Sequence, residues 1–117
     1  MRVTRRQTLL GAAAALLPVP ARAAPEYRLE PRQVADGVWL IEGAQESIAP
    51  ANGGAICNVA MLETPEGAVV VDTGGTLRHG AALRAFADGR LGGVAASLNT
   101  HHHPDHWFGN GAFADRP

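Results

Sequence analysis

Four of the five histidines in this chain fall within six positions near its C-terminus, where residues 100–106 read Thr-His-His-His-Pro-Asp-His. In an extended segment successive side chains alternate between two faces, so the first and third histidines can share a face while His102 points away. Pro104 then turns the backbone, and the next two side chains can converge on the same space from a new element. Imidazole nitrogens and a carboxylate suit a borderline cation such as zinc. The pattern therefore predicts a metal site formed by His101, His103, Asp105 and His106.

Other roles for these residues stay open at this point. A run of histidines can be an expression tag, although a tag would not be interrupted by Pro-Asp or follow a buried strand. Asp105 could serve only as the N-cap of a following helix. We interpret His102 as a packing or surface residue, and the fifth histidine, His79, lies apart on an expected helix.

Short apolar segments between turns indicate the elements that position the motif. A helix is expected at 77–87, ended by Gly89. Residues 99–106 form a loop after the last strand, and a short helix at 107–113 is only weakly indicated because two glycines interrupt it. Hairpin neighbours come first and an alternating unit follows, which predicts a mixed α/β or α+β sheet. Strands are expected at 38–41, 55–63, 68–72 and 94–98.

Composition excludes several classes of protein. The chain has 117 residues with a formal net charge of −1, and all ten of its cations are arginines. Its length allows one domain at most. It has no basic stripe typical of nucleic-acid binders, and no apolar run reaches the ~18 residues of a membrane span. A single cysteine, Cys57, cannot form an internal disulfide, and the 46% apolar content argues against a disordered chain.

Residues 1–23 have the pattern of an export signal. Arginines precede an apolar run at 9–17, and Ala-Arg-Ala at 21–23 fits a cleavage site. Residues 4–9 resemble a twin-arginine signal, although a threonine stands where phenylalanine is more usual; an ordinary secretory signal is the alternative. We expect export to the periplasm, with 24–33 as a leader. The 94 residues after the signal hold six arginines and eleven acidic residues, a formal net charge of −5.

The spacing of the motif resembles a known family. His-x-His-x-Asp-His at 101–106 matches the HxHxDH motif of the metallo-β-lactamase superfamily, and Asp-Thr-Gly at 72–74 is similar to the turn that follows a strand in that family. The resemblance spans 34–117 and implies an αββα sandwich of which only the first half is present. In the family, a further histidine, a bridging carboxylate and a final histidine come from farther along the chain. We therefore expect residues 1–117 to be an N-terminal fragment that alone binds zinc poorly and is inactive.

The same resemblance implies a role for each residue of the motif. His101 and His103 would hold a first zinc, and Asp105 and His106 a second. Asp105 would also be the catalytic residue that holds the proton of the attacking water. Asp72 would lie behind the ligands without binding metal, and a cap of the strand-end turn is its equally open alternative role. Two zinc ions are expected in the complete protein, with iron as a possible substitute.

Two further features relate the chain to particular branches of the superfamily. The most familiar zinc β-lactamases carry arginine at the position that His106 occupies here, and they recruit a cysteine as a zinc ligand. Cys57 instead lies on an early strand and is expected in the core. Segments 34–39, 51–58 and 99–113 are similar to exported zinc metallohydrolases of the quinoprotein relay system, related to SoxH.

This resemblance implies a zinc-dependent hydrolase in which metal-activated water attacks a carbonyl-type ester, thioester, lactone or lactam of a small molecule. The alternatives are a relative of mononuclear-iron sulfur dioxygenases and a non-hydrolytic metal-binding accessory protein of periplasmic quinoprotein metabolism.

Overall fold

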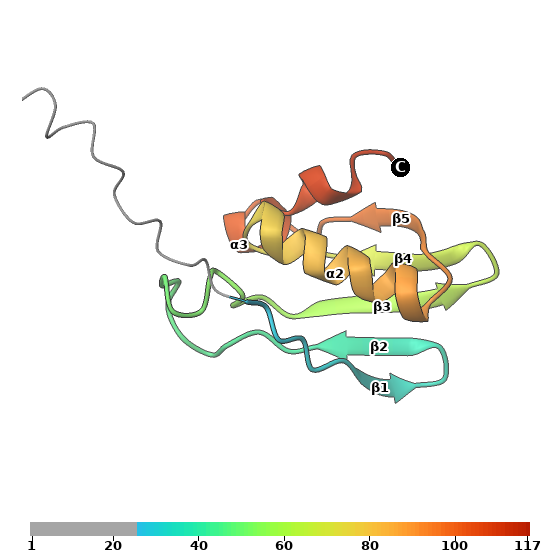
Figure 1. Cartoon of the computed structure of the whole chain (residues 1–117), viewed down its shortest axis with the longest axis horizontal. Helices are drawn as coiled ribbons and strands as arrows, with labels where there is room; N and C mark the ends of the chain where they lie inside the picture. Colours follow the sequence, from blue (N-terminus) through green and yellow to red (C-terminus); the bar gives the residue numbers. More distant parts are fainter. Residues whose placement is uncertain (1–25) are drawn as a thin grey trace, which may run out of the picture.

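The computed structural model describes residues 26–117, and the expected export signal at 1–23 lies outside them. No helix within 26–117 is both long and apolar enough to cross a membrane. The α+β class is confirmed (Figure 1). In chain order the elements are β1 (Arg32–Ala35), β2 (Val38–Ile41), β3 (Val59–Thr64), β4 (Gly67–Val71), α2 (Leu77–Arg90), β5 (Val94–Leu98), α3 (Pro104–Trp107) and the 3₁₀ helix η1 (Asn110–Phe113).

The five strands form one mixed sheet in the order β1-β2-β3-β4-β5. The first four strands are antiparallel neighbours. Short turns join β1 to β2 and β3 to β4, whereas the longer segment 42–58 links β2 to β3. Between β4 and β5 the chain crosses over through α2, and these two strands are parallel. Parallel neighbours end at the same edge, so the segments after β4 and β5 leave the sheet side by side.

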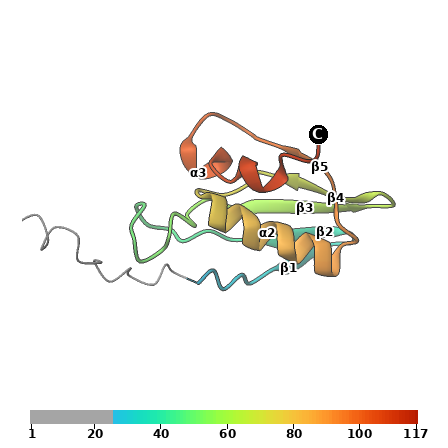
Figure 2. The ribbon, with the colours of Figure 1, turned by 45° about the horizontal axis from the view of Figure 1, so that its top comes forward.

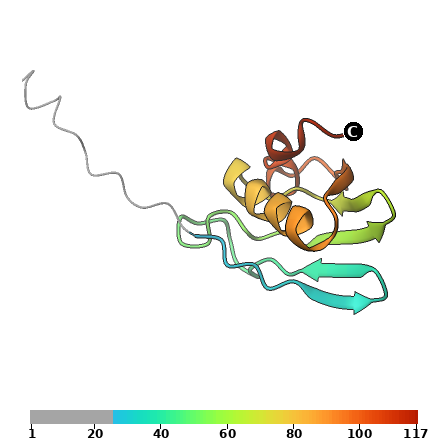
Figure 3. The same ribbon diagram turned by 45° about the vertical axis from the view of Figure 1, so that its right-hand side comes forward.

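Helix α2 lies across one face of the sheet and closes the core (Figure 2). The register pairs Trp39 with Met61 and Met61 with Val70, so one row of side chains faces the helix. Leu83 of α2 is fully buried against this face, and Trp39 meets Phe86 of α2 edge-on with ring centroids 5.7 Å apart. The 3₁₀ helix η1 packs beside α2 (Figure 3) and completes the same core.

The opposite face of the sheet is also apolar. Leu62 is paired with Val69, and Val71 with Leu98, on neighbouring strands. Leu62 and Leu98 remain 39% and 48% exposed. A sheet that is apolar on both faces is typical of a layer between two others.

The N-terminal part of the fold differs from expectation. Residues 24–33 were expected to be a leader, but Arg32 and Gln33 belong to β1 and pair with β2. Tyr27 stacks on His79 of α2, with ring centroids 5.0 Å apart. Strand β1 is exposed at all four positions, so no apolar alternation marked it in the sequence.

Several further boundaries also differ, and the strand expected at 68–72 spans Gly67–Val71. The strand expected at 55–63 begins only at Val59, because the apolar residues before it lie in a partly buried loop, where the Ala55 carbonyl accepts from the Ala44 N–H. Helix α2 continues through Gly89 to Arg90, and positive φ angles at Gly92 and Gly93 follow its end. The expected loop at 99–106 already contains the start of α3, and the segment expected as one helix at 107–113 divides between α3 and η1.

Candidate metal centre

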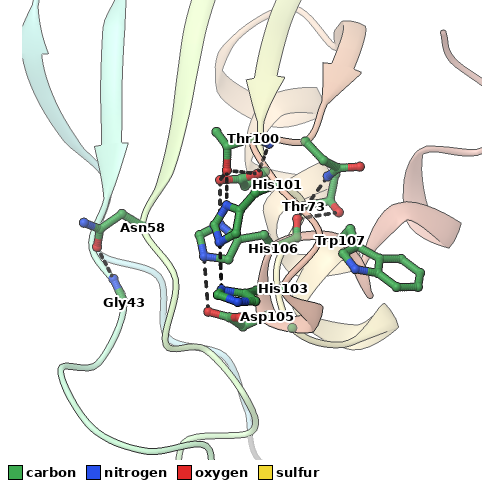
Figure 4. Close-up of polar contacts among 12 residues, drawn as sticks. Gly43, Asn58, Thr73, Thr100, His101, His103, Asp105, His106 and Trp107 are labelled. Carbon is green, nitrogen blue, oxygen red and sulfur yellow. Dashed lines mark hydrogen bonds and ion pairs between the residues drawn. The ribbon is translucent and has the colours of Figure 1, made fainter.

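The residues of the motif gather at the edge of the sheet where β4 and β5 end. Asp72 follows β4 directly, and its backbone N–H donates to Leu98 at the end of β5. His101 and His103 lie on the segment after β5, while Asp105 and His106 lie on α3 (Figure 4). The parallel crossover therefore brings together segments about 30 positions apart in the chain.

Asp72 is the buried centre of this arrangement. Its side chain accepts hydrogen bonds from the Thr100 N–H at 2.8 Å, from the Thr100 hydroxyl, and from His106 Nδ1 at 2.7 Å. Burial raises the pKa of this carboxyl, but the donors of His106 and Thr100 outweigh burial and hold the pKa below its usual value. The ionised carboxylate can only accept a hydrogen bond, so Nδ1 of His106 is the donor in this contact. Asp72 therefore does more than cap the turn after β4.

The four candidate ligands form two close donor pairs. His101 Nε2 lies 3.0 Å from His103 Nδ1, and His106 Nε2 lies 3.3 Å from Asp105 Oδ2. The two pairs lie side by side, because the rings of His101 and His106 are neighbours with centroids 4.0 Å apart. Two nitrogens bound to one tetrahedral zinc at about 2.0–2.1 Å are themselves about 3.3 Å apart. Each pair thus has the separation of two ligands of a single ion.

Within residues 26–117, no three His, Cys, Asp or Glu side chains are arranged as a group that could hold a metal ion. The donors instead supply two half-sites. Their chemistry, three imidazoles and a carboxylate, fits zinc or a similar borderline cation, and each half-site needs further ligands to complete a coordination shell.

His102 takes no part in either pair. Its exposed ring lies edge-on to His101, with centroids 6.4 Å apart, and tilted against His103, with centroids 4.9 Å apart. Its backbone carbonyl accepts from the indole N–H of Trp107 at 2.8 Å. The interpretation of His102 as a surface residue is confirmed.

Two other expectations about single residues have clear outcomes. The N-cap of α3 is His103, with Pro104 in the first turn, so the alternative role of Asp105 as N-cap is wrong. Cys57 is 4% exposed in the core, as expected. Burial, and then the negative charges of Asp105 and Asp72, raise the pKa of the Cys57 thiol to about 12.

The turn after β4 supports the motif through its backbone, which the sequence did not reveal. Thr73 N–H donates to the carbonyl of His106, and Gly109 N–H donates to the carbonyl of Gly74, both at 2.9 Å. The Thr73 hydroxyl donates to Asn110 Oδ1 at 2.6 Å. Gly109 packs so closely that a Cβ atom there would overlap the carbonyl oxygen of Thr73. This close contact with Thr73 requires glycine at position 109, whereas the sequence suggested only that Gly109 interrupts a helix.

Comparison with known families decides the relationship. A family model described as the metallo-beta-lactamase superfamily matches residues 52–117. The chain belongs to the metallo-β-lactamase superfamily. Its membership accounts for the mixed sheet followed by the histidine motif. No curated protein matches the chain.

Solved metallo-β-lactamases share the fold. The structure from Hirschia baltica is 28% identical, with a TM-score of 0.63 over 76% of this chain and 40% of that one. One from Erythrobacter litoralis is 26% identical, with a TM-score of 0.61 over 74% of this chain and 38% of that one. The mono-zinc form of FIM-1 from Pseudomonas aeruginosa, 21% identical, has a TM-score of 0.62 over 80% and 41%. The chain therefore spans about 40% of the length of these metallo-β-lactamases.

Proposed function

We propose that the protein is a zinc-dependent hydrolase that cleaves a carbonyl-type bond, in an ester, thioester, lactone or lactam, of a small molecule. The observation that carries the proposal is the pair of donor sets, with His106 anchored by Asp72. Superfamily membership supports a metal-dependent hydrolase fold.

Each pair has a separate task in this proposal. His101 and His103 would hold one zinc, and Asp105 and His106 the other. Bound zinc supplies a Lewis acid and lowers the pKa of its water toward neutrality. Asp72 accepts a hydrogen bond from Nδ1 of His106, which leaves Nε2 as the ring nitrogen that would bind metal.

Asp105 also has an oxygen that can hold the proton of the attacking water. Its Oδ2 faces His106, and the carboxylate is only about one-fifth exposed. The other oxygen, Oδ1, can accept a hydrogen bond from the attacking water and orient its lone pair toward the substrate carbon. The same side chain would thus hold both metal and nucleophile.

We also propose that the protein acts after export to the periplasm, beside a quinoprotein system. The support is the signal-like pattern of residues 1–23 and the similarity of the segments that flank the motif. Fractionation of cells that produce the protein, with the signal intact and with both arginines of the twin pair replaced by lysine, tests the location.

Metal analysis combined with hydrolysis assays tests the proposed reaction. In the full-length protein, we expect two zinc ions per chain and turnover of at least one thioester, lactone or β-lactam probe. His103→Ala should remove one metal equivalent and lower kcat/KM by at least about a hundredfold, since the metal contributes several kcal/mol. His102→Ala is the matched control and should leave both unchanged. One iron per chain would contradict the proposal in favour of an oxygenase, and two zinc ions without hydrolysis would favour an accessory protein.

A further inference from the structure

His79 lies buried at the start of α2, outside the motif. Its side chain is among the few buried polar groups, at 2% exposure. The ring of Tyr27 stacks on it almost in parallel, at an interplanar angle of 5°. The Tyr27 hydroxyl donates to the Gly53 carbonyl at 2.6 Å and lies 2.7 Å from the hydroxyl of Thr76, which in turn accepts from His79 N–H. Two segments distant in the sequence therefore fix the position of this imidazole.

The His79 ring packs against the turn at Gly74 and Gly75. Its Nδ1 accepts from the Gly75 N–H at 3.4 Å. A Cβ atom on Gly74, whose φ is +89°, would lie only 2.5 Å from the same nitrogen. The ring thus fills the space that a side chain at Gly74 would need, and this contact limits how closely the turn backbone can approach α2.

The same turn contacts the part of the motif that holds the second donor pair. A Cβ atom on Gly75 would lie 3.4 Å from the Cα of Asp105. Thr73 N–H and the Gly74 carbonyl bond to His106 and Gly109, respectively. All three residues of the turn, 73–75, therefore contact residues 105–110, whereas His101 hydrogen-bonds His103 and Thr100 on its own segment.

We propose that His79, clamped by Tyr27, is a positioning residue that holds the turn at 73–75 where Asp105 and His106 can share one metal ion. The inference rests on the proposed function, because it assigns a metal to that pair. It predicts selectivity: loss of the His79 contact weakens the second metal and spares the metal of His101 and His103.

Stepwise zinc affinity, measured by chelator competition on the full-length protein, tests the selectivity. His79→Phe keeps a ring of similar shape but leaves the Gly75 N–H without its acceptor. We expect the second zinc to bind about tenfold more weakly and the first to be unchanged. His79→Asn places an acceptor near the former Nδ1 and should restore part of that loss. Leu83→Val, in the core of the same helix, is the control and should lower Tm without changing either affinity.

A metal-free measurement separates failure of this inference from failure of the proposed function. In His79→Phe without metal, the amides of Thr73 and Gly109 should exchange with solvent about tenfold faster, relative to amides of β3, because their hydrogen bonds form on the turn. Zinc binding by neither the full-length wild type nor the full-length variant would overturn the proposed function alone. Unchanged exchange at both amides, or equal weakening of both zinc ions in His79→Phe and Leu83→Val, would overturn the positioning role.

Discussion

His106 Nδ1 and Asp72 Oδ2 form a 2.7 Å hydrogen bond between residues 34 positions apart. The bond ties the first helical turn after β5 to the end of β4. Asp72 adopts φ of +67°, a left-handed conformation that aspartate and asparagine tolerate better than most residues. This conformation directs the buried carboxylate toward both Thr100 and His106.

Replacing the acceptor should weaken both the site and the fold. Asp72→Asn keeps a side chain that tolerates the left-handed conformation but removes the charge that accepts from His106. We expect zinc affinity to fall about 10–100-fold and the free energy of unfolding to fall by roughly 1.5–3 kcal/mol, the contribution of one hydrogen bond to a charged group. Chelator competition and urea unfolding of the full-length protein measure the two effects. Asp36→Asn, in an exposed turn, should change neither; an equal effect there would argue against a specific role for Asp72.

A methyl group at Gly109 should disrupt the contact between the turn and the motif. Gly109→Ala would push a Cβ atom into the carbonyl oxygen of Thr73, and we expect a loss of roughly 1–3 kcal/mol in unfolding free energy. Gly89→Ala is the matched control, because nothing lies within 4 Å of its added Cβ. In the last turn of α2 that change should stabilise by up to about 0.5 kcal/mol. Thermal unfolding of the two variants should therefore shift in opposite directions.

The stability of the protein should depend on pH through His79. Burial lowers the pKa of this imidazole below its ordinary value of 6.5, so the folded state favours the neutral ring. Above about pH 6.5 the ring is neutral in both states, and His79 causes no dependence. As pH falls below that value the unfolded chain takes up a proton first, and stability declines until pH passes below the folded pKa.

Urea midpoints measured from pH 7.5 to 5 compare wild type with His79→Phe. Other titrating groups contribute to both proteins, so the difference between the two curves isolates His79. The wild-type midpoint should fall more steeply with acidification. Parallel curves would show that the imidazole is not held neutral by the fold.

Cys57 should be chemically inert in the folded protein. The thiol is buried and its pKa is raised to about 12, so almost no thiolate exists near neutral pH. Labelling with a disulfide reagent at pH 8 should be at least about a hundredfold slower than in 6 M guanidinium chloride, which unfolds the chain. Rapid labelling of the folded protein would indicate that the loop before β3 opens readily.

Much of the fold follows from local patterns in the sequence. Strands β2 and β5 were predicted at their observed bounds, because apolar residues between turn residues favour short buried strands. Strand β1 was missed because all of its residues are exposed and only pairing with β2 orders them. The apolar segment before β3 is a partly buried loop, which periodicity alone does not distinguish from a strand.

The sequence by itself determined which side chains could bind metal, since alternation along an extended segment separates His102 from its two neighbours. Only the tertiary structure decided how those side chains are held. The bond from Asp72 to His106, the close approach of Gly109 to Thr73 and the support from His79 each join segments that are adjacent through the crossover or helix packing. Contacts between segments depend on strand register and on the docking of α2 and α3, and no local pattern of residues encodes them.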